Sequence, residues 1–342
     1  MAEMIPFSSR DWLTGKYRRH FTQWFVKKNG FRNFFIRLDN QINFSFFRES
    51  KAYGDSIVVG KDNWLFEKSY IKEMNGEQPV NINRMESKIS RLKQLQNILE
   101  SRGIYFLLVI APSKATIYNE FIAQRHIKMH PVRETGNYIK IKNLLDSNGI
   151  NYLDGHSFFL QNKKDAPYDL FVKGGTHWSY YGASLFSKDL ISKIQKDTNL
   201  PLGTLSYQDI KADYNPQGTD RDLAELLNVF NDKATRSLTG HPVMRVTFPE
   251  DSIRPNVLLV GDSFMHTVNK YTDKIFGIRD FYYYFKQNIP EPWDNERRHI
   301  AQKERLKKLI LSKEIIIIEN NEANLRQLGF GFIGAACKAL KI

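Results

Sequence analysis

The hydrophobic pattern of the chain alternates between amphipathic helices and short runs of consecutive apolar residues. The clearest helix runs from about residue 83 to Gly103, where apolar residues recur every three or four positions and a glycine marks the end. It leads directly into residues 105–111, a continuous apolar run typical of a strand that is buried on both faces. A helix followed by a buried strand is the pattern of α/β folds.

The same order recurs along the rest of the chain. The further elements predicted are helices at about 132–148, 180–197 and 295–311 and buried strands at 150–153, 256–260 and 314–318. Buried strands separated by helices favour a mostly parallel, doubly wound sheet flanked by helices. We therefore expect an α/β fold of this kind.

Two stretches depart from this pattern and suggest how the chain is divided. Residues 1–55 are rich in Phe, Trp, Arg and Asn at partly helical spacing, which predicts one or two helices packing on a core elsewhere, followed by a hairpin at 56–66. We expect residues 1–80 to form an N-terminal helical extension that packs on a main domain at 81–342. Within that domain, the polar residues 198–250 are expected to form an excursion or a cap over one edge.

Composition narrows the class of protein. The 342 residues include 50 Lys and Arg against 37 Asp and Glu, a formal net charge of +13, and 42% are hydrophobic, which excludes wholesale disorder. The basic excess suggests an anionic partner such as nucleic acid, acidic glycan or a membrane surface. Because the positive charges are dispersed along the chain, we expect no specific nucleic-acid binding. The apolar runs are far shorter than the ~20 residues that cross a bilayer.

Short sequence motifs give no support for a metal or a cofactor. The sequence has no HExxH or CxxC spacing and no GxGxxG or GxxxxGK[ST] loop. The single cysteine, Cys337, cannot form an internal disulfide or a cysteine-rich metal site. We expect neither a metal site nor a cofactor.

One strand end carries a candidate nucleophile. The strand at 256–260 runs into Gly261-Asp262-Ser263-Phe264, which places Ser263 on a sharp turn just before a predicted helix. There its hydroxyl would be exposed, and the helix N-terminus, including the Ser263 backbone N–H, would offer positive dipole to an oxyanion. The alternative is that Ser263 only caps the helix, with help from Asp262.

A candidate general base lies ahead of another helix. His177 directly precedes the helix at 180–197, with Ser179 as its N-cap, and a helix N-terminus disfavours the cationic imidazole. His177 could therefore accept the proton of Ser263. The alternative is an ordinary surface histidine, and two competitors exist: His266, three residues after Ser263, and His156, at the end of the strand 150–153.

Four segments of the sequence, taken in order, resemble the alginate O-acetyltransferase family of the AlgJ/AlgX type, a branch of the SGNH hydrolase-like fold. The segments are VGKDNWLF at 59–66, APSKATIY at 111–118, GTHWSYYGA at 175–183 and LLVGDSF at 258–264. The resemblance places the family nucleophile on Ser263 and the family base on His177. It places the family acid on position 175, which is a glycine here.

The glycine at position 175 leaves three outcomes open. Another acid could take the role, with Asp154 at a strand end and Asp169 as candidates; the site could work as a Ser–His dyad; or activity could be reduced or lost. We expect a relocated acid or a dyad, because Ser263 and His177 keep their strand and helix contexts.

The resemblance implies an O-acetyltransferase that moves an acetyl group through a serine acetyl-enzyme onto hydroxyls of a cell-envelope or secreted polysaccharide. Alternatives are an acetylesterase or deacetylase with the same Ser–His chemistry, and a catalytically weak carbohydrate-binding component of an exopolysaccharide complex. The resemblance also implies an extracytoplasmic location, an N-terminal membrane anchor missing from this chain, and an acetyl donor delivered by a membrane-bound acyltransferase partner.

Several side chains are candidates for binding an acceptor glycan, which could be anionic. Trp178 and Tyr283 could stack on sugar rings, and three basic groups could meet carboxylates of an acidic glycan: Lys114, Arg279 and Arg297. The alternative for each is an ordinary core or surface role.

Overall fold

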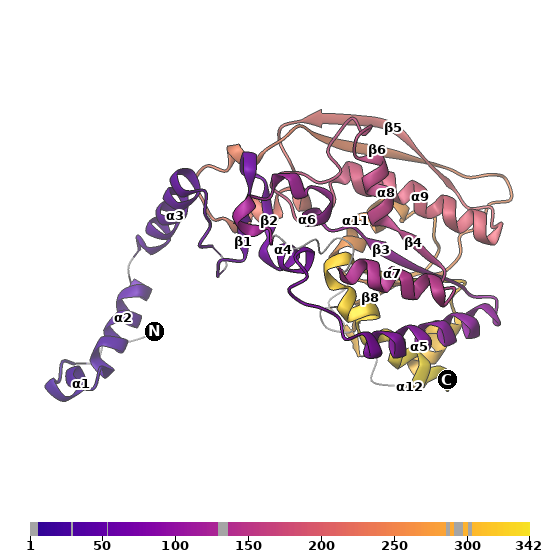
Figure 1. Ribbon diagram of the computed structural model, residues 1–342, viewed down its shortest axis with the longest axis horizontal. Helices are drawn as coiled ribbons and strands as arrows, with labels where there is room; N and C mark the ends of the chain where they lie inside the picture. Colours follow the sequence, from indigo (N-terminus) through magenta and orange to yellow (C-terminus); the bar gives the residue numbers. More distant parts are fainter. Residues whose placement is uncertain are drawn as a thin grey trace.

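A central sheet lies between two layers of helices, and a helical arm projects from one end of the molecule (Figure 1). The computed structural model describes residues 6–28, 30–52, 54–128, 136–284, 288–290, 297–299 and 303–342. Within these ranges no helix is long and apolar enough to span a bilayer.

The main sheet has seven strands in the described part of the chain, in the order β10-β9-β8-β7-β11-β3-β4. Their bounds, in chain order, are β3 Tyr105–Ala111, β4 Tyr152–Asp154, β7 Val257–Gly261, β8 Arg279–Tyr283, β9 Asn288–Pro290, β10 Arg297–His299 and β11 Ile315–Asn321. The strands from β8 to β4 are parallel, whereas β9 and β10 pair antiparallel at one edge. The α/β fold with a mostly parallel sheet, predicted from the hydrophobic pattern, is confirmed.

Alternate residues of the buried strands face opposite helix layers, as strand geometry requires. Leu107 and Val109 of β3 pack with one layer, and Phe106 and Leu108 pack with the other. The first layer is formed by α6 Lys114–Ile117, α8 Gly155–Asn162, α9 Tyr180–Thr198 and α11 Ser263–Thr272; the second by α5 Ile82–Glu100, α7 Asn137–Ser147, α12 Lys303–Leu311 and α13 Phe332–Leu340. The parallel strands therefore end at one edge, where α/β proteins bind ligands.

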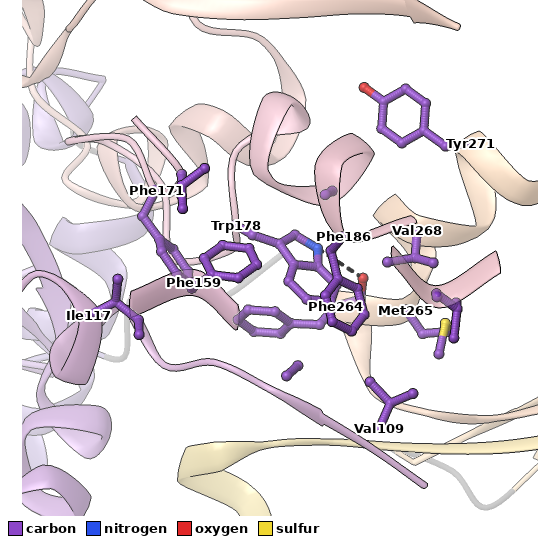
Figure 2. Close-up of a cluster of buried hydrophobic side chains, with 14 of the residues drawn as sticks. Val109, Ile117, Phe159, Phe171, Trp178, Phe186, Phe264, Met265, Val268 and Tyr271 are labelled. Atoms are coloured by element: carbon purple, nitrogen blue, oxygen red, sulfur yellow. Dashed lines mark hydrogen bonds between the residues drawn. The ribbon is translucent and has the colours of Figure 1, made fainter. Parts of the chain in front are cut away.

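The first layer contains a dense aromatic cluster, shown in Figure 2. Phe159, Trp178, Phe186 and Phe264 are fully buried there and come from α8, α9, α11 and the segment before α9. The rings of Trp178 and Phe264 are 5.4 Å apart, edge to face. This cluster joins the two segments that carry the candidate nucleophile and base.

The N-terminal part contains helices, a hairpin and a short connecting helix. The elements are α1 Ser9–Leu13, α2 Lys16–Lys28, α3 Arg32–Ile42, a π-helical turn at Asn43–Phe47, the hairpin β1 Ile57–Val59 with β2 Leu65–Glu67, and α4 Lys68–Met74. The predicted hairpin is thus present, and the apolar residues of its two strands are buried. The aromatic side chains of α1 to α3 differ from expectation: most are exposed instead of packed on a core.

Residues 204–247 add a long two-stranded ribbon outside the main sheet. Strands β5 Thr204–Asp213 and β6 Thr239–Thr247 pair antiparallel and pack along α9 (Figure 1). The connection between them contains a 3₁₀ turn at Gly218–Arg221 and the short helix α10 Asp222–Leu226. This connection supplies a residue of the site described below.

Most predicted elements are found within a few residues of their expected ends. The predicted helix at 132–148 is seen from Asn137, since 129–135 lie outside the described residues. The helix predicted at 295–311 is wrong in its first part, because residues 297–299 form strand β10 and α12 begins at Lys303. The last strand, β11, extends beyond its predicted end at 318 to Asn321. The hydrophobic pattern did not include Glu319, Asn320 and Asn321 because they are polar, although they are buried.

Candidate active site

Ser263 is the first residue of α11 and is separated from the end of β7 by one residue, Asp262. Asp262 is the N-cap of this helix, because its side chain accepts the Phe264 N–H at 3.0 Å. The Ser263 hydroxyl is thereby left for other partners at a strand end and a helix N-terminus, where the helix dipole favours developing negative charge. Asp262, not Ser263, therefore caps this helix.

The turn that carries Ser263 is hydrogen-bonded to a buried carboxyl group, that of Glu319. Glu319 of β11 accepts the Asp262 N–H at 3.0 Å, and a Cβ at Gly261 would lie 2.6 Å from Glu319 Oε2. Burial, followed by the neighbouring Asp262, raises the pKa of Glu319 well above its usual value. Glycine at 261 therefore makes room for the buried side chain of Glu319.

His177 is positioned by the segment that leads into α9. Ser179 caps α9 by accepting the Gly182 N–H at 2.9 Å, as the sequence predicts. The adjacent Trp178 is fully buried, and its Nε1–H donates to the Phe264 carbonyl at 3.2 Å (Figure 2). This bond fixes the His177 segment to the first turn of α11, and His177 Nε2 lies 2.7 Å from Ser263 Oγ.

The other imidazole nitrogen of His177 is bonded to Asp222, the first residue of α10. Nδ1 lies 2.5 Å from Asp222 Oδ2, and the second carboxylate oxygen accepts the backbone N–H groups of Thr176 and Leu223, both at 2.7 Å. Asp222 can only accept, so Nδ1 carries the proton and Nε2 is free to accept the proton of Ser263. The three side chains form a Ser–His–Asp arrangement.

Gly175 explains why the acid comes from elsewhere in the chain. A Cβ at this position would meet the Thr219 carbonyl oxygen at 2.6 Å and the Asp220 backbone at 3.1 Å. The connection between β5 and β6 therefore occupies the space that a side chain at 175 would need, and the same connection delivers Asp222. Sequence reasoning missed Asp222 because it lies in a polar stretch with no strand-end signal; the glycine at 175 was the one hint that the acid had moved.

Neither carboxylate expected beside His177 is its partner. Asp154 caps α8 by accepting the Ser157 N–H at 3.1 Å and pairs with Lys142 at 2.5 Å. Asp169 lies two residues before Phe171, which forms an isolated β-bridge with Trp178. Burial raises the pKa of the Asp169 carboxyl group. The expectation of Asp154 or Asp169 is corrected to Asp222, which the fold brings in from a distant part of the sequence.

Two of the proposed glycan-binding side chains are in the core. Lys114 is 1% exposed, and its Nζ donates to the carbonyl oxygens of Leu65, Val172, Lys173 and Gly175 at 2.6–2.9 Å. It ties β2 to the segment before His177, and burial lowers its pKa to about 7. Because Trp178 is also buried, neither residue can meet a sugar.

The remaining glycan-binding candidates divide between the two ends of the sheet. Arg279 begins β8 opposite Val257, at the end of the sheet away from Ser263, and donates to Asn269 at 3.0 Å. Tyr283 ends β8 opposite Gly261, so it does lie at the Ser263 end. The side chain of Arg297 lies outside the described residues.

The competing histidines occupy separate positions around this end of the sheet. The His266 ring packs against Phe281 at 4.8 Å and Tyr283 at 5.2 Å, and burial, with a smaller effect of His177, lowers its pKa. His156 Nδ1 pairs with Glu322 at 2.9 Å and lines a cavity of about 200 Å³. The Ser263 hydroxyl bonds to His177, which selects that histidine as its base.

The cavity beside His156 lies at the ends of β3, β4 and β11. Its polar lining side chains are Tyr70, Glu73, Ser113, Thr116, Asn119, Asn137, Tyr138, His156 and Glu322. Met74, Ile139 and Leu160 also line it, and the greater part of its accessible lining is apolar. It neighbours the Ser263 turn through Asn321, whose N–H donates to Asp262 at 3.4 Å, while the next residue, Glu322, lines the cavity. Within the described residues, no three His, Cys, Asp or Glu side chains are grouped so that they could hold a metal ion.

The burial of Asp220, two residues before Asp222, allows the packing of this segment to be tested. Burial raises the pKa of Asp220 to about 8, and its Oδ2 has no hydrogen-bond partner among the described residues. Between the usual pKa and 8, the folded protein holds a proton that the unfolded chain releases, so stability falls as pH rises. We expect the Tm of Asp220→Asn to exceed that of the wild type by a difference that grows from pH 5 to pH 8. A Tm difference that does not change with pH would contradict this account.

Proteins with similar sequences are named as probable alginate O-acetylases. The chain is 24% identical over 184 residues to a protein of Pseudomonas aeruginosa named "Probable alginate O-acetylase AlgJ", a match covering 54% of this chain and 44% of that protein. A protein of the same name from Pseudomonas putida is 21% identical over 160 residues, covering 46% of this chain and 38% of the relative. The chain thus spans less than half the length of these curated relatives.

Solved structures share the architecture at low sequence identity. The O-acetyltransferase domain of Pseudomonas putida AlgJ superposes with a TM-score of 0.54 at 14% identity, covering 84% of this chain and 99% of that one. Bacillus cereus PatB1 with a sulfonyl adduct gives 0.51 at 11% identity, covering 81% and 97%. The family described as "SGNH hydrolase-like domain, acetyltransferase AlgX" matches residues 57–272, more than half of the chain, which therefore belongs to this family.

Proposed function

We propose that the protein is an O-acetyltransferase that forms an acetyl-enzyme at Ser263 and passes the acetyl group to a polysaccharide hydroxyl. The observation that carries this proposal is the hydrogen-bonded series Ser263–His177–Asp222 at the end of the parallel sheet. The family and the names of the AlgJ relatives support acetyl transfer to a glycan. Since the chain covers less than half of those relatives, the activity and substrates rest on the site.

In the first half-reaction, Ser263 Oγ attacks the acetyl carbonyl of the donor while His177 Nε2 takes the hydroxyl proton. The new Oγ–C bond forms a tetrahedral oxyanion, which the N-terminus of α11 and the Ser263 N–H stabilise. The bond to the donor's leaving oxygen then breaks, and His177 returns the proton to that oxygen. Asp222 holds the imidazole in orientation and stabilises its cationic form during these steps.

In the second half-reaction, a sugar hydroxyl takes the place of the leaving group. His177 accepts its proton as the sugar oxygen attacks the acetyl carbon, and collapse of the oxyanion releases Ser263 Oγ, which regains a proton from His177. Water can perform the same attack, and the product is then acetate. The choice between transferase and esterase depends on whether an acceptor is held near Ser263.

We place the acceptor in the cavity beside His156. Its hydroxyl, amide and carboxylate groups suit the hydroxyls of one sugar ring, and it opens at the same edge of the sheet as Ser263. Glu73 and Glu322 both border this cavity, which disfavours a carboxylate directly within it. We propose further that the protein acts outside the cytoplasm and receives acetyl groups from a membrane-bound acyltransferase.

The function is tested by supplying p-nitrophenyl acetate as donor together with either an oligouronate or a neutral oligosaccharide. We expect an oligosaccharide that has gained an acetyl group, detected by mass spectrometry, and less free acetate as the acceptor concentration rises. His156→Ala should raise the acceptor KM while leaving nitrophenol release without acceptor unchanged. Acetate as the sole product, at every acceptor concentration, would favour an esterase instead.

A further inference from the structure

Exposed apolar side chains are concentrated in residues 7–47, which we call the N-terminal arm. The large apolar residues of the arm whose side chains are exposed are Phe7, Trp12, Leu13, Phe21, Phe25, Phe31, Phe34, Phe35, Leu38, Ile42, Phe46 and Phe47. Elsewhere in the described chain, exposed large apolar residues are scattered, which is normal for a protein surface. A continuous set of this size marks an interaction surface.

The first part of the arm forms a row of aromatic rings. Tyr17, Phe21 and Phe25 lie four residues apart on one face of α2, with ring centroids 6.3 Å and 5.9 Å apart. Phe7 and Trp12 continue the row, at 5.2 Å and 6.1 Å from the Tyr17 ring. These rings contact one another. The helices that carry most of them, α1 and α2, extend away from the body of the protein (Figure 1).

The second part of the arm turns its polar side towards the protein. In α3, Arg37 donates to the Val229 carbonyl at 2.7 Å and Asn40 donates to the Asn228 carbonyl at 3.3 Å. The residues that recur every three or four positions on its other side, Phe31, Phe35 and Leu38, are 71%, 58% and 37% exposed. An amphipathic helix normally buries its apolar side, so this orientation presents the apolar side to a partner outside the chain.

The charge of the arm identifies the chemistry of that partner. Residues 7–47 contain eight Lys and Arg but two Asp and no Glu, a formal excess of +6 within the +13 of the whole chain. A second copy of the chain would bring an equally basic arm against this one, and like charges repel. Aromatic side chains flanked by Lys and Arg are the composition of helices that lie in a membrane interface.

We propose that the N-terminal arm docks on an anionic lipid surface. The aromatic row of α1 and α2 and the exposed side of α3 enter the boundary between headgroups and acyl chains, and the Lys and Arg residues meet lipid phosphates. The helices lie in the plane of the membrane, since α2 and α3 have 13 and 11 residues and are too short to cross it. This inference is independent of the acetyl transfer proposed above.

Sedimentation of the full chain with vesicles tests the proposal. We expect binding to vesicles that contain phosphatidylglycerol, weakened by added salt, and little binding to phosphatidylcholine alone. Phe21→Ser with Phe25→Ser, and separately Arg18→Glu with Arg19→Glu, should each weaken binding about tenfold or more. The matched control, Ile253→Ser with Ile278→Ser, removes two exposed apolar side chains of the body and should bind as the wild type.

Two results would overturn the proposal. One is that phosphatidylglycerol vesicles fail to sediment the wild type, or sediment the Phe21 and Phe25 variant equally well. The other is a concentration-dependent dimer in solution that the same two substitutions abolish, which would assign the arm to a second copy of the chain. Unchanged Tm values in the variants would show that the body remains folded, because the substituted side chains are exposed.

Discussion

Ser263→Ala is expected to abolish the acetyl-enzyme and to lower turnover of p-nitrophenyl acetate by a factor on the order of 10⁵ to 10⁶. The reason is that Ser263 Oγ, 2.7 Å from His177 Nε2, is the atom that forms the covalent bond in the proposed mechanism. Intact-mass spectrometry of the wild type, quenched during turnover, should show one added acetyl group. The alanine variant should show none.

The control for this experiment is a serine at the same edge of the sheet. Ser113→Ala removes the hydroxyl that caps α6, whose oxygen accepts the Ala115 N–H at 3.3 Å. This variant should lose some stability, of order 1 kcal/mol for a helix cap. Assayed without acceptor, because Ser113 borders the cavity beside His156, it should still form the adduct. An adduct of equal yield in Ser263→Ala would remove Ser263 as the nucleophile, even if turnover had fallen.

Asp222→Asn is expected to lower kcat/KM by about 10³- to 10⁴-fold, the size of effect seen when the acid of a serine triad is amidated. The asparagine amide would donate to His177 Nδ1, which places the imidazole proton on Nε2. In that tautomer Nε2 cannot accept the proton of Ser263. The measurement is kcat/KM for p-nitrophenyl acetate together with the Tm of the variant, since Asp222 also accepts two backbone N–H groups.

Two comparisons separate this effect from general damage to the segment. Asp169→Asn changes a carboxyl group that does not contact His177, so its kcat/KM should stay within a few-fold of the wild type. Gly175→Asp combined with Asp222→Ala should not restore activity, because a Cβ at 175 would lie 2.6 Å from the Thr219 carbonyl. Equal rates for Asp222→Asn and the wild type would mean that the site works as a Ser–His dyad.

The acid differs from the nucleophile and the base in how its position is specified. Ser263 and His177 are placed by local features: a strand end, a helix N-cap and a buried tryptophan next to the histidine. Asp222 reaches His177 across 45 positions of the chain because the ribbon of β5 and β6 packs on α9.

Hydrophobic periodicity predicted the central strands of the sheet and most of the helices that flank them, but not the edge strands β9 and β10 or the ribbon of β5 and β6. The alternation of helices with apolar strands predicted β3, β4, β7 and β11 within a few residues. Of these, β3, β7 and β11 are buried on both faces, and β4, at the edge of the sheet, is half-buried. The turn bearing Ser263 and the capped helix after His177 were predicted as well, since both depend on neighbouring residues. The close approach of Ser263 and His177 depends on tertiary packing, because Trp178, next to His177, donates to the Phe264 carbonyl in the first turn of α11.

Only the tertiary structure decided which polar groups belong to the site. It brought in Asp222, and it buried Lys114 and Trp178 in structural roles, because burial and long-range pairing depend on elements distant in sequence. It also exposed the aromatic residues of the N-terminal arm, whose amphipathic spacing resembles that of a core helix. A periodic pattern shows which side of a helix is apolar, but the partner of that side is set by the packing of the whole chain.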